Sequence, residues 1–168
     1  MAITKLIHMK ESASKEKGKH LKNAIRYILN PQKTADGLYM NSNCGCNAEE
    51  IYEGMLETKQ QHGKTWGRQG YHFVISFAPG EVTEETAFAV MQDFTEQYLK
   101  DEYDYVYVVH NDKEHIHGHL IFNSLSYNGY KYHYKEGQWK NEIQPVTYSI
   151  CRKYGLNGLL QKEIKTGR

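Results

Sequence analysis

The chain has 168 residues, of which 39% are hydrophobic and 24% are charged, and this is typical of one globular domain. No apolar run approaches the roughly 18 residues of a membrane helix, the N-terminus lacks a signal-peptide pattern, and three cysteines are too few for a disulfide scaffold, so we expect a cytoplasmic protein without membrane insertion. The formal net charge of +1, taken alone, argues against a nucleic-acid-binding protein.

The first half of the chain predicts two strands separated by two helices. Alternating apolar residues predict a strand over residues 3–9, and a polar loop follows to about residue 19. Apolar residues at helical spacing then predict a short helix that ends before Pro31 and a second helix over about 47–62. Segment 71–77 is rich in β-forming residues and is therefore predicted to be a strand.

The second half predicts a helix, a hairpin, a short strand and a last helix. A 3.6-residue apolar repeat follows Thr83, and two aromatic and β-branched segments, 103–110 and 116–123, are separated by a turn. We expect a further strand over 130–134 and a helix over 144–154. The element order predicts an α+β fold with a central antiparallel five-stranded sheet flanked by helices.

Residues 110–119 hold four of the nine histidines. Residues two apart in a strand project from the same face, so His115, His117 and His119 are expected to lie together. His110, at the end of the neighbouring strand, can reach across the hairpin to join them. A divalent cation would satisfy such imidazoles, and ligation by histidine alone leaves open positions for water or phosphate oxygens, as catalytic sites require.

Other interpretations of these histidines remain open on the residues alone. They can be cross-strand partners on a solvated sheet face, or hold a structural metal in a DNA-binding module without catalytic activity. A third alternative takes His110 and Asp112 as the His-x-Asp pair of a histidine-ligated Fe(II) oxygenase, with His133 as the third ligand.

Three segments carry a resemblance to a known family. HNDKEHIHGHLIFN (residues 110–123) resembles the third motif of the P-type Mob conjugative and mobilization relaxases, which belong to the HUH endonuclease group. AIRYILNPQKT (24–34) resembles their first motif, and YHFVISFAPGEVT (71–83) resembles the strand and turn between the two. Gly118 departs from the pattern, because the family usually has an apolar residue between the paired histidines.

The resemblance implies site- and strand-specific nicking and strand transfer at an origin of transfer, through a 5′-phosphotyrosine intermediate, to initiate conjugative transfer or mobilization. A replication initiator with the same HUH chemistry is the related alternative. The site residues that the resemblance implies are Tyr27 as nucleophile, Asp112 as the acid that orients a ligand, His110, His117 and His119 as ligands of a divalent metal (Mg or Mn), and His115 as a fourth ligand or a neighbour of the ligands.

The same resemblance implies contacts to single-stranded DNA at the transfer origin. Lys22, Arg26 and Lys33 flank Tyr27 and are expected to hold adjacent phosphates, and Asn123 is expected to contact DNA. Accessory transfer proteins and the coupling protein of a secretion system are the further partners implied. We expect residues 1–168 to form a single relaxase domain, which can be the N-terminal part of a longer protein.

The near-neutral charge is a cancellation. Residues 1–40 hold eight basic and three acidic side chains, residues 41–130 hold five and fourteen, and residues 131–168 hold eight and three. We expect the two basic ends to flank the metal site and the DNA to lie between them.

Overall fold

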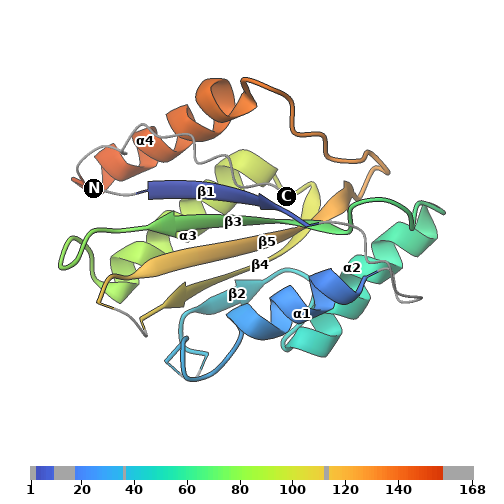
Figure 1. Ribbon diagram of the computed structural model, residues 1–168, viewed down its shortest axis with the longest axis horizontal. Helices are drawn as coiled ribbons and strands as arrows, with labels where there is room; N and C mark the ends of the chain where they lie inside the picture. Colours follow the sequence, from blue (N-terminus) through green and yellow to red (C-terminus); the bar gives the residue numbers. More distant parts are fainter. Residues whose placement is uncertain (1–2, 10–17, 36, 112–113, 157–168) are drawn as a thin grey trace.

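The computed structural model describes residues 3–9, 18–35, 37–111 and 114–156, and in these residues a five-stranded antiparallel sheet is flanked by helices (Figure 1). The α+β prediction is therefore confirmed. The strands are β1 (Ile3–His8), β2 (Met40–Ser42), β3 (Gly70–Ser76), β4 (Tyr103–His110) and β5 (His117–Ser126). The helices are α1 (Lys19–Ile28), α2 (Ala48–Gln61), α3 (Glu84–Leu99) and α4 (Gln144–Lys153), and a π-helical turn over Trp139–Ile143 precedes α4. The strand order is β1-β3-β5-β4-β2, so β5 lies at the centre.

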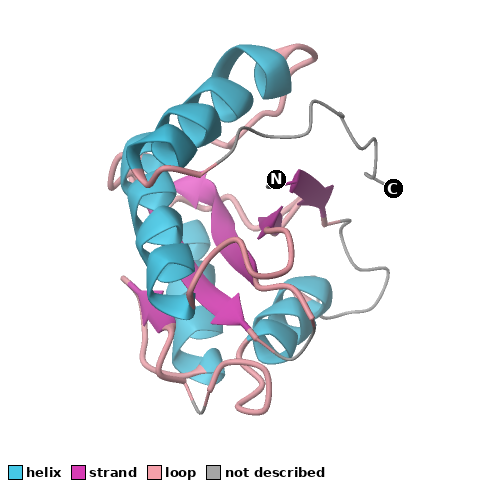
Figure 2. Ribbon diagram, turned by 90° about the vertical axis from the view of Figure 1, so that its left-hand side faces the viewer, coloured by secondary structure: helices cyan, strands magenta, loops and turns pink. Residues whose placement is uncertain are grey.

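Helices cover both faces of the sheet, with α1 and α2 on one side and α3 and α4 on the other (Figures 1 and 2). The alternating residues of strand β4 explain why both faces need a covering layer. Its residues Val106 and Val108 pack in the core under α1 and α2, whereas Tyr107 and Val109 pack in the core under α3 and α4. A strand buried on both faces has a nearly continuous apolar sequence, as β4 does.

The helices begin and end where local chemistry requires. In α1, Leu21, Ile25 and Ile28 are fully buried at helical spacing, and the helix stops shortly before Pro31. The Asn47 side chain accepts a hydrogen bond from the Glu50 amide at the start of α2, which satisfies one of the amides without an intrahelical partner. Among the described residues, no helix has the length and apolar character needed to cross a bilayer.

The fifth strand is not the one that the sequence pattern predicted. Residues 130–134 form only an isolated bridge between Lys131 and Leu125. The Tyr132 ring packs edge-on against Phe122 in the core, so its aromatic character serves packing and not strand formation. Strand β2, only three residues long, takes the edge position beside β4 instead.

The expectation that both basic ends flank one site is wrong for the part of the chain that the structure describes. Helix α1 packs in the core on one face of the sheet, whereas the π-helical turn and α4 pack through Trp139, Ile143 and Ile150 on the opposite face. Each helix docks by its apolar side, and surface charge does not decide which face of the sheet receives it.

Candidate active site

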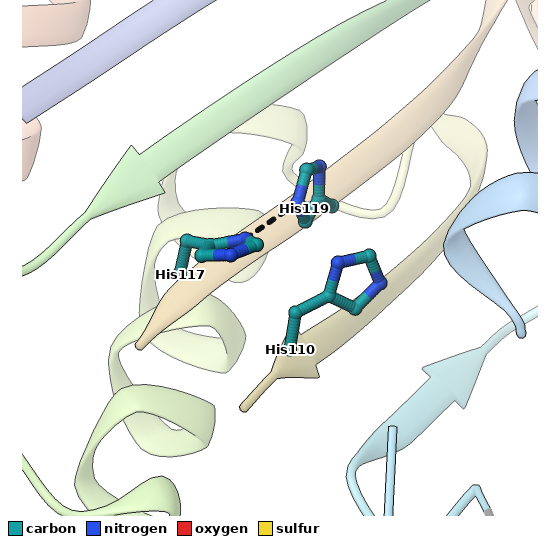
Figure 3. Close-up of side chains that lie close together, drawn as sticks. All are labelled: His110, His117 and His119. Carbon is teal, nitrogen blue, oxygen red and sulfur yellow. Dashed lines mark hydrogen bonds between the residues drawn. The ribbon is translucent and has the colours of Figure 1, made fainter. Parts of the chain in front are cut away.

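Three histidines converge on the α1 side of the sheet. The antiparallel register places His110 of β4 directly opposite His117 of β5, and His119 lies two residues further along on the same face (Figure 3). All three side chains are buried. Each offers a ring nitrogen, and these atoms lie within 4.8 Å of one another. Burial of this group contradicts the alternative of a solvated sheet face.

Hydrogen bonds fix the orientation of two of these rings. His117 Nδ1 and His119 Nε2 lie 2.9 Å apart, so one proton is shared between two facing nitrogens. On its other side, His119 Nδ1 lies 2.7 Å from Nε2 of His72, a buried histidine of β3. Burial lowers the pKa of His72 to about 4, so its ring is neutral at pH 7 and its Nε2 can accept a hydrogen bond from the His119 Nδ1–H. That arrangement leaves the lone pair of His119 on Nε2, facing the other histidines.

Sequence reasoning did not single out His72. Its only local signal is one histidine within the otherwise apolar and aromatic segment of β3. Its role becomes visible once the β3–β5 pairing is known, because Val74 pairs with His119 and His72 lies two residues away on the same face.

The third histidine connects the cluster to helix α1. His110 Nε2 donates a hydrogen bond of 2.8 Å to the carbonyl of Ile28, the last residue of α1. A carbonyl only accepts, so Nε2 carries the proton and the lone pair of the neutral ring is on Nδ1. The neighbouring Tyr27 ring stands edge-on to His110, with the ring centroids 6.4 Å apart. Tyr27 is 53% exposed and is therefore accessible to a large substrate.

The basic residues around Tyr27 differ in their contacts. The Lys33 ammonium lies 5.3 Å from the centroid of the Tyr27 ring. Arg26 instead donates from Nε and Nη2 to the Glu49 carboxylate of α2, and Lys22 Nζ lies 3.8 Å from the same carboxylate. The Arg26 hydrogen bond lowers the pKa of Glu49. Sequence patterns did not identify this acidic partner, which neutralises part of the positive charge of Lys22 and Arg26.

The DNA contact expected of Asn123 is wrong. Its side chain is fully buried and donates to the Met55 carbonyl and to Asp104 Oδ2, at 2.9 Å in both cases. Thr58 of α2 donates to the same Asp104 oxygen at 2.7 Å. Asn123 therefore joins β5 to α2 and β4 inside the protein, because a buried amide needs hydrogen-bond partners.

The remaining predicted site residues lie around or outside the cluster. His115 is half-buried beside His117, with ring centroids 5.5 Å apart, and does not belong to the converging group. Asp112 lies outside the described residues. His133 is exposed on the loop after β5 and is likewise not part of that group, so the alternative iron site lacks its third ligand.

The donor set fits a divalent cation. Three buried imidazoles converge from two adjacent strands, and hydrogen bonds with Ile28 and His72 orient the rings of His110 and His119. Such outer contacts accompany metal-binding histidines in general. Three neutral ligands leave several coordination positions for oxygen atoms of a substrate.

Comparison with known proteins agrees with these features. The family model described as "Relaxase: MobA/VirD2-like, nuclease domain" matches residues 27–156. "Protein rlx" of Staphylococcus aureus is 30% identical over 158 residues, covering 94% of this chain and 44% of the relative. A second S. aureus "Protein rlx" is 28% identical over 136 residues, covering 81% and 42%. "Group II intron-interrupted relaxase LtrB" of Lactococcus lactis subsp. cremoris (strain MG1363) is 25% identical over 174 residues, covering 81% and 31%.

The chain thus spans less than half the length of these curated relatives. A solved structure described as "Molecular Basis of Vancomycin Resistance Transfer in Staphylococcus aureus" shares the fold, with a TM-score of 0.54 and 11% identity over 97% of this chain and 99% of that chain. Since the family model covers more than three quarters of the residues, the chain belongs to the MobA/VirD2-like relaxases and contains their nuclease domain.

Proposed function

We propose that this chain nicks one DNA strand at an origin of transfer and holds the new 5′ end on Tyr27, which initiates conjugative transfer or mobilization. The observation that carries the proposal is the position of Tyr27, exposed and edge-on to one of three converging, buried imidazoles. A nucleophile next to a site for a divalent cation is the arrangement that phosphodiester cleavage requires.

The reaction is a transesterification. The Tyr27 phenol oxygen attacks the scissile phosphorus and forms a phosphotyrosine bond, while the bond from phosphorus to the 3′ oxygen breaks. The phenol proton leaves to solvent, and the departing 3′ oxygen takes up a proton to become a hydroxyl. Because one phosphodiester replaces another, the bond energy is retained and the reverse reaction rejoins the strand.

Different site residues bind the metal and the DNA phosphate in this proposal. We assign His110, His117 and His119 as ligands of a divalent metal, with Mg or Mn as the candidates. When bound, the metal supplies positive charge for the non-bridging oxygens of the scissile phosphate. Lys33, whose ammonium lies over the Tyr27 ring, holds a phosphate next to the nucleophile.

Four further residues have supporting roles in the proposal. Lys22 and Arg26 contribute to DNA binding after exchanging Glu49 for phosphates. Asp112 orients a ligand histidine, and His115 stands next to the ligands as a fourth donor or a contact to DNA.

The proposed substrate is single-stranded DNA of the transfer origin, processed in the cytoplasm. Accessory transfer proteins and the coupling protein of a secretion system are the proposed partners. Residues 1–168 act as one catalytic domain, which fits the coverage of less than half of the curated relatives.

Covalent trapping tests this proposal. A labelled single-stranded oligonucleotide carrying the element's own transfer origin is incubated with the protein, and a protein–DNA adduct is sought on a denaturing gel with and without chelator. We expect an adduct with the wild type that is lost on chelation and lost in Tyr27→Phe. Tyr39→Phe is the matched control, since Tyr39 donates to Glu85 at 2.9 Å and this contact raises its pKa to about 12. An adduct that persists in Tyr27→Phe would overturn the assignment of the nucleophile.

A further inference from the structure

Two loops at the end of the sheet away from the histidines are joined to each other. They are residues 62–69, between α2 and β3, and residues 127–131, which follow β5. The Lys64 ammonium donates to the Gly129 carbonyl at 2.6 Å, from one loop to the other. Contacts of this kind hold the loops in one arrangement without burying their outward side chains.

A second lysine, on the other loop, donates in the opposite direction. The Lys131 ammonium donates to the Trp66 carbonyl and lies 5.2 Å from the centroid of the Trp66 ring. Gly67 in the first loop has a positive φ of 80°, and a Cβ atom there would lie 2.8 Å from Lys131 Nζ. The backbone at Gly67 therefore leaves room for the lysine head group beside the indole.

A third connection fixes the tip of the second loop. His62 Nε2 donates to the Tyr127 carbonyl at 2.9 Å. Gly129 has a φ of 83°, and a Cβ atom there would lie 2.8 Å from His62 Nδ1. The loops are thus closely packed, yet Trp66 remains 57% exposed and Tyr130 72% exposed. Large aromatic rings held open to solvent are a feature of nucleic-acid stacking surfaces.

The charge of the two loops favours a polyanion. They contain three basic residues, Lys64, Arg68 and Lys131, and no acidic residue. This is unusual for the surrounding sequence, because residues 41–130 hold fourteen acidic and only five basic side chains. Basic side chains interleaved with exposed aromatic rings can pair with phosphates while bases stack on the rings.

We propose that Trp66, Tyr130, Lys64, Arg68 and Lys131 form a loop platform that binds single-stranded DNA by base stacking and phosphate pairing. The inference rests on the proposed function, since it supplies a binding site for the same strand. Strand β5 begins at His117 and has 10 residues, so at about 3.3 Å per residue its other end, where the loop over residues 127–131 begins, lies roughly 30 Å from His117. Figure 1 shows β5 running the length of the sheet. The loop platform would therefore hold nucleotides well away from the scissile phosphate.

Tryptophan fluorescence gives a direct test, because the chain has two tryptophans and the other, Trp139, is 7% exposed. The protein is titrated in chelator with a mixed-sequence single strand of roughly 25 nucleotides, longer than one stacking site requires. We expect the emission to fall on binding, and to be insensitive to DNA in Trp66→Phe. Trp66→Ala should raise the Kd for the single strand by roughly 5- to 100-fold. Lys131→Gln should reduce the slope of log Kd against log salt by about 0.7.

Tyr148→Ala is the matched control. Tyr148 is also an exposed aromatic residue, and the Arg152 guanidinium lies 5.8 Å from its ring centroid. It belongs to α4, however, which packs on the face of the sheet opposite to α2. It should leave the Kd unchanged, and circular dichroism checks that every variant is folded. An unchanged Kd in both Trp66→Ala and Lys131→Gln would overturn the proposal. Equal weakening of single-stranded and duplex DNA by Trp66→Ala would also overturn it, because stacking requires unpaired bases.

The binding assay separates this proposal from the proposed function, since no cleavage is needed. If the wild type forms no adduct at its transfer origin but Trp66 is quenched by single strands, the proposed nicking fails and the loop platform stands. If the adduct forms and the platform variants bind DNA like the wild type, only the platform is refuted.

Discussion

Gly118 lies between His117 and His119, and we predict that a larger residue there will destabilise the fold. Its missing side chain would point at α3, where the buried Met91 side chain fills the space. A Cβ atom at Gly118 would lie 2.6 Å from Met91 Cγ and even closer to its sulfur. The backbone at Gly118 is outside the positive-φ region, so the obstacle to a side chain is steric, and the three nearest atoms all belong to Met91.

The size of the expected change in the free energy of unfolding follows from the packing around Gly118. Gly118→Val overfills a closely packed core and should lower the free energy of unfolding by about 1–3 kcal/mol. Met91→Ala alone opens a cavity at a fully buried position and should cost about 2–5 kcal/mol. In the double variant the valine occupies part of that cavity, so the combined loss should fall short of the sum by at least about 1 kcal/mol.

Urea unfolding followed by circular dichroism measures all three variants, and the wild type supplies the fourth corner of the cycle. Distant sites add within about 0.5 kcal/mol, so a larger coupling identifies direct contact. Additive losses in the double variant, or a Gly118→Val variant as stable as the wild type, would show that Met91 does not block a side chain at residue 118.

Two further predictions concern buried polar residues. His72→Phe removes the hydrogen-bond acceptor for His119 Nδ1 and should raise the Kd for Mn²⁺ by about 10- to 100-fold in calorimetry. His72→Gln should have a smaller effect on this Kd. An unchanged Kd in His72→Phe would contradict the role of His72 in orienting His119. Burial is the main cause that lowers the pKa of Lys59 to about 7; the Asp104 carboxylate opposes the shift and the Lys131 ammonium adds a smaller lowering contribution. Between about pH 7 and 10.5 the unfolded chain holds a proton at Lys59 that the folded chain lacks, so the wild type should gain stability as pH rises, by at most about 1.4 kcal/mol per pH unit. Lys59→Met should lose that gain between pH 7.5 and 9.5 in urea unfolding, and an equal slope in both proteins would rule out this effect of burial.

The convergence of the histidines could be predicted because it depends on local rules. Alternation along a strand places His117 and His119 on one face, and the antiparallel pairing of β4 with β5 brings His110 opposite His117. Tyr27 could be singled out only by the resemblance of its segment to a family motif. Without that resemblance, no sequence pattern around Tyr27 distinguishes it from the other thirteen tyrosines.

The features that sequence reasoning missed depend on long-range contacts. His72 and Glu49 become partners of site residues only after strands and helices distant in sequence have packed together. Strand β2 has three residues at a sheet edge, too short for an alternating pattern to be recognised. Asn123 ends a motif whose resemblance suggested a DNA contact. Strand β5 is buried on both faces, however, so the Asn123 amide lies inside the protein.

The hydrogen bond from His110 to the Ile28 carbonyl couples one of the proposed cation ligands to the last turn of α1, which carries Tyr27. Any free energy that a bound cation gains from a fixed His110 ring also favours docking of the last turn of α1, and by reciprocity a docked helix favours the cation. Because Tyr27 belongs to that turn, a cation in the proposed site would favour one position of Tyr27 without touching its side chain.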